Sequence, residues 1–205
     1  FAFLCDRLSI IGLSRTLMET VQDKFQVRRL LSEIEHGAFA QPLFLEITQS
    51  MRREDIEQLG FPLIAKMRRG ASKRHIYRLD DWNEVKHFLS RKNLENLGVR
   101  GHDFLLEQYI EGDEIIVTGF AQNFHFHLVS VHDRIAQTTP PYIDLEHRFP
   151  SRYAHLATSI REIHNQACLK LQLSDTPVVS EWKVVADRLD LVELSAQIPG
   201  EHVAD

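Results

Sequence analysis

The sequence predicts an α+β fold made of two lobes, and three observations predict it. Short apolar runs typical of strands are interspersed with amphipathic stretches typical of helices. Strands come first, a helix lies between them, and strands return, with the division near residue 103. Hydrophobic residues make up 43% of the 205 residues, which is enough for a sizeable core.

The first half of the chain opens with one long helical pattern, Ser14 to Ser32, in which apolar residues recur at helical spacing. The elements expected after it are a strand at Pro42 to Ile47, a short helix at Arg53 to Gln58, a strand at Leu63 to Lys66, its hairpin partner at Ile76 to Leu79, and a helix that Asp81 caps and that runs through Leu89.

The second half is richer in strands. The pattern predicts strands at Phe104 to Tyr109 and Ile115 to Gln122, joined across "IEGDE", then a strand at Phe124 to Val131, an irregular segment from Ile135 to Arg152, a helix from about His155 to Leu171, and a last hairpin, "VVSEWKVVADRLDLVELSAQ".

Composition excludes several classes of protein. Cys5 and Cys168 are too few for a disulfide framework, which favours a reducing compartment, and we expect the cytoplasm. No apolar run approaches the roughly 20 residues of a membrane span, so no membrane partner is expected. The net charge is -5 and the basic cluster is confined to one loop, which disfavours nucleic acid as a partner. His125 and His127 share a strand face but lack further ligands at zinc spacing.

Positive charge gathers where a buried strand ends. The strand "FPLIA" stops at Lys66, and the segment after it is unusually basic, with Arg68, Arg69, Lys73, Arg74 and Arg78. A polyanion such as a nucleotide phosphate would suit this cluster, since lysine binds phosphate as a point charge. A solvated hairpin is the alternative for the arginines.

Negative charge gathers in the last hairpin. A loop of three or five residues around Arg188 would place Ser195 opposite Glu181 and Glu193 opposite Lys183, all on one face. The two carboxylates would then be diagonal neighbours, about 7–8 Å apart at the backbone. They could converge on one Mg²⁺, which is usually held by one or two carboxylates together with substrate phosphates. The alternative is a solvated sheet face on which Glu181 pairs with Lys183 or another cation.

Five segments follow one another along nearly the whole chain, namely "QDKFQVRRLL", "FPLIAKMRRGAS", "LLEQYIEGDE", "RFPS" and "SEWKVVADRLDLVELSAQIPG", and twelve residues separate Glu181 from Glu193. In its order and spacing this pattern resembles the ATP-grasp superfamily of carboxylate–amine and carboxylate–thiol ligases. It implies an ATP-grasp fold with a nucleotide cleft between two α+β lobes. It assigns residues 1–32 to a linker strand and helix from a domain that precedes this sequence, 33–103 to a lid lobe, and 104–205 to a metal-binding lobe that is incomplete at its C-terminus.

The resemblance also implies a role for particular residues. Lys66 would bind the α- and β-phosphates of ATP under a lid that includes Ser72, with Lys24 as a second cation. The adenosine would be bound by a set of residues between the lobes, namely Glu107 on the adenine side, the Gln108 carbonyl, Tyr109, the Ile110 amide, and Glu114 at the ribose hydroxyls. Glu181, Glu193 and Ser195 would bind Mg²⁺, with Mn²⁺ as the alternative ion. Lys66, Ser195 and Gln197 would be catalytic.

The implied activity is an ATP- and Mg²⁺-dependent ligase that activates a carboxylate as an acylphosphate for attack by an amine or similar nucleophile. Its partners would be small-molecule carboxylates and amines, and a homodimer through regions outside this sequence is one alternative for the oligomeric state. Two departures favour a different function, a catalytically degenerate module with an assembly or regulatory role. The lid has few Gly and Ser residues, and Ser195 and Gln197 replace the asparagine and arginine usual in the family.

Overall fold

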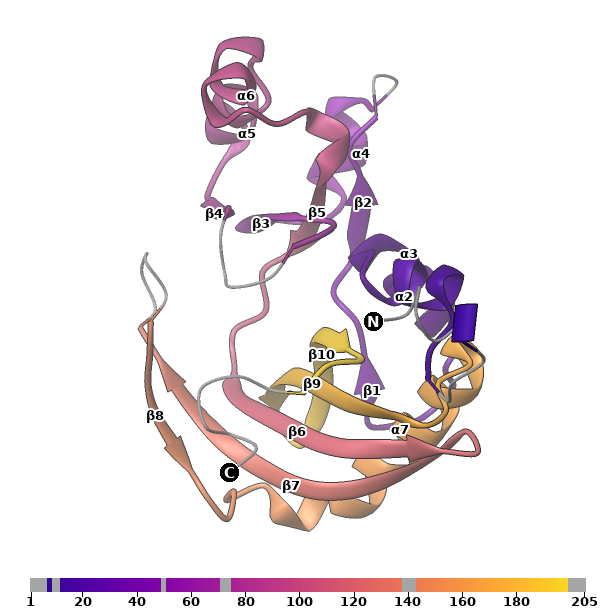
Figure 1. Cartoon of the computed structure of the whole chain (residues 1–205). Coiled ribbons are helices and arrows are strands. Elements are labelled where there is room, and N and C mark those ends of the chain that lie inside the picture. The colour runs from indigo at the N-terminus through magenta and orange to yellow at the C-terminus, as the bar shows by residue number, and fades with distance from the viewer. Residues whose placement is uncertain (1–6, 9–11, 49–50, 71–74, 138–142, 199–205) are drawn as a thin grey trace. The chain divides into compact units, whose positions relative to one another are not determined.

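Two compact units make up the chain, whose structure is a computed structural model that describes residues 7–8, 12–48, 51–70, 75–137 and 143–198 (Figure 1). The larger unit joins residues 1–41 to residues 111–205, and the smaller unit comprises residues 42–110. Within the described residues, no helix combines the length and the apolar character that a membrane span requires.

The larger unit contains a six-stranded sheet with the order β1-β10-β9-β6-β7-β8. Its strands are β1 (Phe39–Ala40), β6 (Asp113–Gln122), β7 (His125–Ala136), β8 (Asp144–Arg148), β9 (Thr176–Val185) and β10 (Arg188–Ser195). Neighbouring strands are antiparallel except for β1, which pairs with β10 in parallel.

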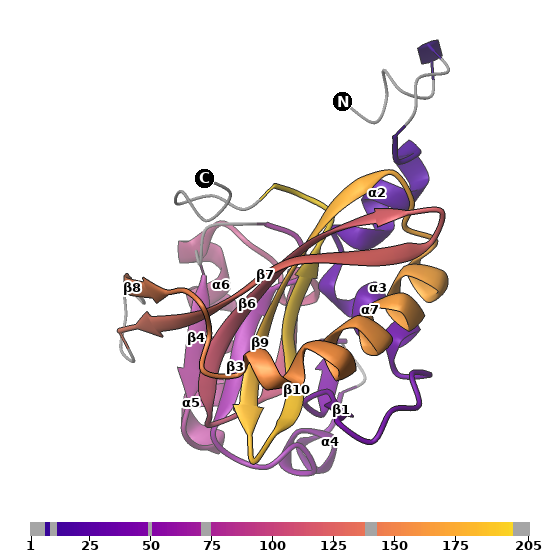
Figure 2. The same cartoon turned by 90° about the horizontal axis from the view of Figure 1, so that it is seen from below.

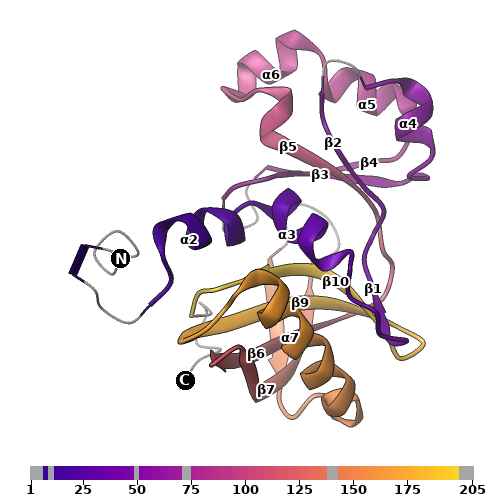
Figure 3. The same cartoon turned by 90° about the vertical axis from the view of Figure 1, so that its right-hand side faces the viewer.

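Three α-helices accompany this sheet among the residues the structure describes, namely α2 (Arg15–Val21), α3 (Lys24–Leu31) and α7 (Ala157–Leu171), the last preceded by the 3-10 turn η2 (Ala154–Leu156). Helix α7 lies along one face of the sheet (Figures 2 and 3). Strand β9 shows why the sheet has two different faces, because its residues alternate strictly between buried and half-buried. Ser180 and Trp182 turn toward α7, whereas Glu181 and Lys183 turn to the opposite face.

The smaller unit contains a four-stranded antiparallel sheet with the order β2-β5-β3-β4. Its elements are β2 (Phe44–Glu46), α4 (Arg53–Glu57), β3 (Leu63–Met67), β4 (Ile76–Leu79), α5 (Trp82–Phe88), α6 (Arg91–Leu97), the 3-10 turn η1 (Gly101–Asp103) and β5 (Phe104–Gln108). Phe88 and Phe104 meet edge to face at 5.0 Å between ring centroids in the middle of its core.

The predicted helix from Ser14 to Ser32 is wrong as a single element, because the chain breaks at Gln22 and Asp23. The Asp23 carboxylate accepts a hydrogen bond from the Phe25 amide at 3.0 Å and thereby starts α3 as its N-cap. Aspartate competes with the backbone for such amides, so it favours a cap over a helix interior.

The sequence analysis missed the two-residue strand β1, the helix α6 and the strand β8. Helix α6 begins after Ser90, whose hydroxyl accepts from the Asn93 amide. Strand β8 lies within the segment expected to be irregular and pairs with the end of β7, with Arg148 opposite Asp133. The division between the units also differs from the expected residue 103. The smaller unit extends to Ile110, because β5 pairs with β2 and β3. Residues 1–41 belong to the same unit as the second half of the chain.

Candidate functional site

One face of the sheet in the larger unit is polar, on the side opposite α7. The residues that form it, called the polar face below, are Glu114 on β6, Arg134 on β7, Glu181 and Lys183 on β9, and Glu193 and Ser195 on β10. The register brings them together, since Glu114 lies opposite both Arg134 and Lys183 on its two neighbouring strands. Three of the expected site residues from β9 and β10 therefore share a face with the expected ribose residue.

The predicted register of the last hairpin is wrong. Its loop has two residues, Ala186 and Asp187, both in the left-handed region with φ of 48° and 64°. A register shift follows between Leu191 and Glu193. As a result Glu193 lies directly opposite Glu181, and Ser195 lies opposite Val179. The two carboxylates are direct cross-strand neighbours rather than diagonal ones, which brings them closer than predicted.

Each of the two glutamates has a cationic partner. The Glu181 carboxylate lies 2.6 Å from Nη1 of Arg134. The Glu193 carboxylate lies 3.1 Å from Nζ of Lys24, which is only 14% exposed and comes from α3. Mutual repulsion between the facing carboxylates is therefore offset by a guanidinium on one side and an ammonium on the other.

Arg134 is the residue of the polar face that the sequence analysis missed. Its guanidinium is 9% exposed and contacts three carboxylates, those of Glu114 at 2.9 Å, Asp144 at 3.1 Å and Glu181 at 2.6 Å. Burial lowers the pKa of Arg134, but the three negative charges outweigh burial and raise that pKa above its ordinary value. The signal that could have found Arg134 is its place on β7 opposite Glu114, but the predicted strand stopped at Val131.

Glu114 is held on both sides. Besides Arg134, it contacts Nζ of Lys183 at 2.7 Å, and Lys183 also donates to the Gly112 carbonyl at 3.2 Å. The side chain of Glu114 remains 24% exposed. Its carboxylate can therefore accept further hydrogen bonds, as a ribose-binding residue would need to do.

The predicted phosphate lysine lies in the smaller unit and is buried in an ion pair. Nζ of Lys66 is 2.6 Å from the Glu107 carboxylate, and the two side chains are 8% and 5% exposed. Glu107 lies opposite Ile64, so it is the diagonal neighbour of Lys66 on one face of the β3–β5 pair. Two residues that the sequence analysis assigned to different parts of the nucleotide are thus direct partners.

The segment after β5 is fixed by its backbone. The Gln108 amide donates to the Leu43 carbonyl at 2.9 Å, and the Tyr109 amide donates to the Pro62 carbonyl at 3.0 Å. The Arg78 guanidinium lies 4.8 Å from the centroid of the Tyr109 ring. Ile110, the last residue of the smaller unit, is half-buried.

Ser195 is half-buried at the end of β10, and Gln197 is exposed two residues later. Ser72 lies outside the described residues. Cys168 lies on the buried side of α7, where burial raises the pKa of its thiol to about 12, so it is not a nucleophile near neutral pH.

The donor set fits a metal ion that arrives with a ligand. The described part of the chain holds no group of three or more His, Cys, Asp or Glu side chains placed for a metal. Glu181 and Glu193 supply two hard carboxylate donors side by side. Mg²⁺ commonly takes only one or two carboxylates and completes its coordination with water and phosphate oxygens, so these residues fit Mg²⁺ accompanied by a nucleotide.

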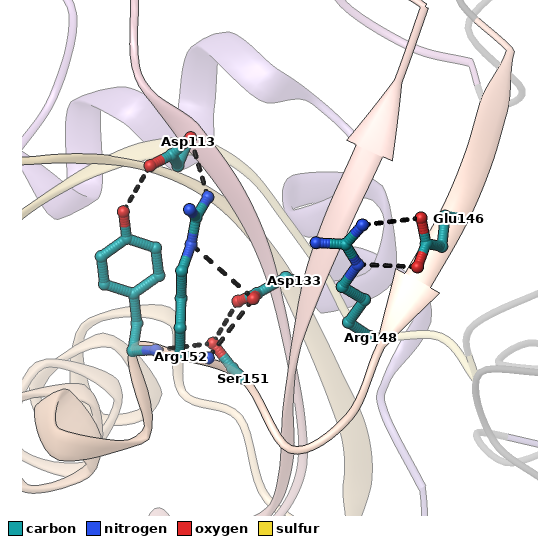
Figure 4. A network of polar contacts seen from close by, with 7 residues as sticks. Asp113, Asp133, Glu146, Arg148, Ser151 and Arg152 are labelled. Atoms are coloured by element: carbon teal, nitrogen blue, oxygen red, sulfur yellow. Dashed lines mark hydrogen bonds and ion pairs between the residues drawn. The ribbon is translucent and has the colours of Figure 1, made fainter.

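A second polar network braces the strands that carry the site (Figure 4). Asp133 on β7 accepts hydrogen bonds from the Ser151 hydroxyl and from the Arg152 amide at 3.3 Å. Arg152 reaches Asp113 on β6 at 2.9 Å, and the Tyr153 hydroxyl donates to the same carboxylate. The network anchors the segment between β8 and α7 to β6 and β7 on the sheet face opposite the polar face.

Comparison with solved structures identifies the fold. The L-amino acid ligase from Bacillus licheniformis matches 97% of the chain at 21% identity and a TM-score of 0.70. D-alanine–D-alanine ligase from Bacillus anthracis matches 99% at 19% identity and a TM-score of 0.76. N5-carboxyaminoimidazole synthetase from Staphylococcus aureus, solved with ADP, matches 97% at 14% identity and a TM-score of 0.76.

The chain spans 46%, 66% and 50% of these three proteins, respectively. A scan against models of protein families found no match, and neither did a search of curated proteins. Because these alignments extend over almost the whole of this chain, the predicted ATP-grasp fold is confirmed. The chain has the fold of the ATP-grasp ligases.

Proposed function

We propose that this chain is the ATP- and metal-binding part of a ligase that activates a carboxylate with ATP for attack by an amine or similar nucleophile. The observation that carries the proposal is the pair of facing carboxylates, Glu181 and Glu193, on the same sheet face as Glu114. Two adjacent carboxylates that need phosphate oxygens to complete a metal site suit a nucleotide–metal complex. The shared fold with ligases supports the same reaction class.

The proposed reaction has two steps. A carboxylate oxygen attacks the γ-phosphorus of ATP, the bond to the bridging oxygen breaks, and ADP leaves an acylphosphate behind. The amine nitrogen then attacks the acyl carbon, phosphate leaves with the bonding electrons, and the nitrogen loses a proton. The protein forms no covalent bond in either step, so it contributes by positioning the reactants and neutralising charge.

In this proposal Glu181, Glu193 and Ser195 hold Mg²⁺, which would neutralise phosphate charge when bound. Glu114 accepts hydrogen bonds from the ribose hydroxyls. Lys66 leaves Glu107 for the nucleotide phosphates, which offer it more negative charge than one carboxylate. Lys24 and Ser72 also bind phosphate in this proposal, and Gln108, Tyr109 and Ile110 bind adenine. A cytoplasmic location belongs to the proposal as well.

One observation favours the alternative, a module that binds nucleotide without catalysis. Gln197 is exposed just past β10, at the position where the resemblance expects an arginine. Glutamine offers hydrogen bonds but no charge to the transferring phosphoryl group.

The experiment is a comparison of ATP binding in the full-length protein and in its Glu181→Gln/Glu193→Gln variant, titrated by calorimetry with and without Mg²⁺. We expect Mg²⁺ to strengthen ATP binding in the first protein and to have little effect in the second, because glutamine is a poor ligand for a hard cation. Glu162→Gln/Glu95→Gln, two exposed glutamates away from the polar face, is the matched control. An unchanged Mg²⁺ dependence in the double variant would refute the metal assignment.

Turnover separates the ligase from the alternative. The full-length protein is offered sets of carboxylates and amines with Mg²⁺ and ATP, and ADP release is measured. Release that depends on both substrates supports the ligase. Binding of ATP with Mg²⁺ but no release with any pair supports the module.

A further inference from the structure

A buried arginine of the larger unit reaches the backbone of β10. The Arg28 side chain belongs to α3, and the residue is only 2% exposed. Its Nη2 donates to the Val192 carbonyl at 2.8 Å, and its Nη1 lies 3.5 Å from the amide oxygen of Gln41. Gln41 in turn donates to the Arg28 carbonyl at 3.1 Å. Burying a guanidinium is costly unless it is well bonded, so these contacts account for a charge in this position.

Val192 is the residue at which the register of β10 shifts. Leu191 lies opposite Trp182 and Glu193 lies opposite Glu181, so Val192 is the extra residue of a β-bulge. Without the bulge, Glu193 would lie opposite Ser180 and would face α7, because a slip of one residue turns each side chain to the other face of a sheet. The bulge is therefore what brings Glu193 to the polar face.

The same helix also contacts the side chain that the bulge reorients. Lys24 precedes Arg28 by four residues, so both side chains lie on one face of α3. Lys24 binds the Glu193 carboxylate at 3.1 Å while Arg28 binds the carbonyl of the preceding residue. Figure 3 shows α3 beside β10. One face of α3 thus contacts two consecutive residues of β10, Val192 through a hydrogen bond and Glu193 through an ion pair.

We propose that Arg28 is a positioning residue that holds the bulge at Val192 and thereby keeps Glu193 directly opposite Glu181. A bulge leaves a backbone group outside the regular ladder of hydrogen bonds, and the buried guanidinium supplies a donor there. The role in metal binding rests on the proposed function, whereas the role in the register of β10 does not.

The test compares Arg28→Met with the neighbouring control Arg29→Met, whose wild-type side chain is exposed. Methionine keeps much of the apolar stem and removes every donor. The first measurement is nuclear magnetic resonance of β9 and β10 in the full-length protein. In wild type and Arg29→Met we expect a cross-strand contact between the backbone protons of Glu181 and Glu193. In Arg28→Met we expect that contact to weaken, with a new one between Ser180 and Glu193.

The second measurement is the Mg²⁺ concentration that gives half-maximal enhancement of ATP binding. We expect it to rise about tenfold in Arg28→Met, the loss usual when a residue that orients a metal ligand is removed. Should Arg28→Met fail to fold, Arg28→Lys keeps the charge but loses the planar fork, and the same changes are expected in smaller measure.

The two measurements separate the two claims. An unchanged contact between Glu181 and Glu193 in both variants overturns the positioning role. A changed contact in a protein whose wild type shows no Mg²⁺ effect on ATP binding supports the positioning role and counts against the proposed function alone.

Discussion

Charge is neutralised in different ways in the two units. In the smaller unit one lysine and one carboxylate, Lys66 and Glu107, form a single buried pair between β3 and β5. In the larger unit Arg134 is shared among three carboxylates, and Lys183 adds a second cation to one of them. A phosphate that binds Lys66 competes with the Glu107 carboxylate. A metal or ribose that binds Glu181 or Glu114 competes with Arg134 for that carboxylate, while Arg134 still has its other carboxylate partners.

Removal of Arg134 should have the largest effect. Arg134→Met leaves Glu114, Asp144 and Glu181 close together without their shared cation. Breaking a buried ion pair by removing one partner costs about 3–5 kcal/mol, so we expect a loss of that order in the free energy of unfolding of the larger unit. Denaturant unfolding followed by Trp182 fluorescence in a Trp82→Phe background measures it, since Trp182 belongs to the larger unit and is the second of two tryptophans in the chain.

Arg148→Met is the matched control, because Arg148 is an exposed arginine on the neighbouring strand β8 that pairs only at the surface with Glu146. We expect a cost below about 1 kcal/mol there. Hydrogen exchange of β3 and β5 should stay unchanged in both variants if the two units unfold separately. Equal losses in Arg134→Met and Arg148→Met would remove the contrast between the network and an ordinary surface pair.

A buried histidine makes the larger unit sensitive to acid. His164 donates from Nδ1 to the Ile160 carbonyl and accepts at Nε2 from the Ser180 hydroxyl, so its ring is neutral. Burial lowers the pKa of His164 to about 4. The unfolded chain takes up a proton below about pH 6.5, and the folded chain does so only near pH 4, so stability is complete above pH 6.5 and falls between these values.

The expected loss is about 3 kcal/mol in the free energy of unfolding between pH 6.5 and pH 4. Trp182 fluorescence follows it directly, because the indole donates to the same Ser180 hydroxyl at 2.7 Å. His164→Gln should flatten this part of the pH profile, and His87→Gln, an exposed histidine on α5, should not. A profile that is equally steep in His164→Gln would show that other groups cause the acid sensitivity.

The smallest effect concerns the buried pair of Lys66 and Glu107 in the smaller unit. Lys66→Met should weaken binding of ATP by about 1.5–3 kcal/mol, the range for a hydrogen bond to a charged group, and should weaken AMP less because fewer phosphate charges lose their partner. Calorimetric affinities for the two nucleotides measure the difference. Lys86→Met, an exposed lysine on α5 in the same unit, is the control. Equal losses for ATP and AMP would place Lys66 away from the β-phosphate.

Local patterns predicted much of the fold, and pairing between distant strands accounts for most of what they missed. The hairpin of β3 and β4 and the cap at Asp81 follow from neighbouring residues, and the structure confirms them. The contact between Lys66 and Glu107 depends on β3 lying beside β5, which no pattern in either strand specifies. Both residues were identified from the family resemblance, but not as partners.

The register of the hairpin of β9 and β10 was unpredictable for a more specific reason. Its turn places an alanine at a positive φ, for which alanine has no preference, so the sequence carries no signal for a two-residue loop. Val192 likewise resembles any other strand residue, although it is the bulge. Arg134 and Asp144 were missed because β7 runs further than its apolar alternation and β8 is short and polar.

Because of the bulge at Val192, the pair of facing carboxylates depends on the pairing register of β10 as well as on which residues are present. Side chains of a strand point to alternate faces of the sheet, so the face that Glu193 occupies depends on how many residues separate it from the turn. The bulge adds one residue to that number and so places Glu193 on the same face as Glu181. A strand with the same residues but without the bulge would carry Glu193 and Ser195 through the sheet to the side that α7 covers. A deletion of Val192 would instead close the ladder with Glu193 still opposite Glu181. A relative of this chain can therefore keep every proposed ligand residue and still lack the pair of facing carboxylates. Another can lack the residue at position 192 and still have that pair.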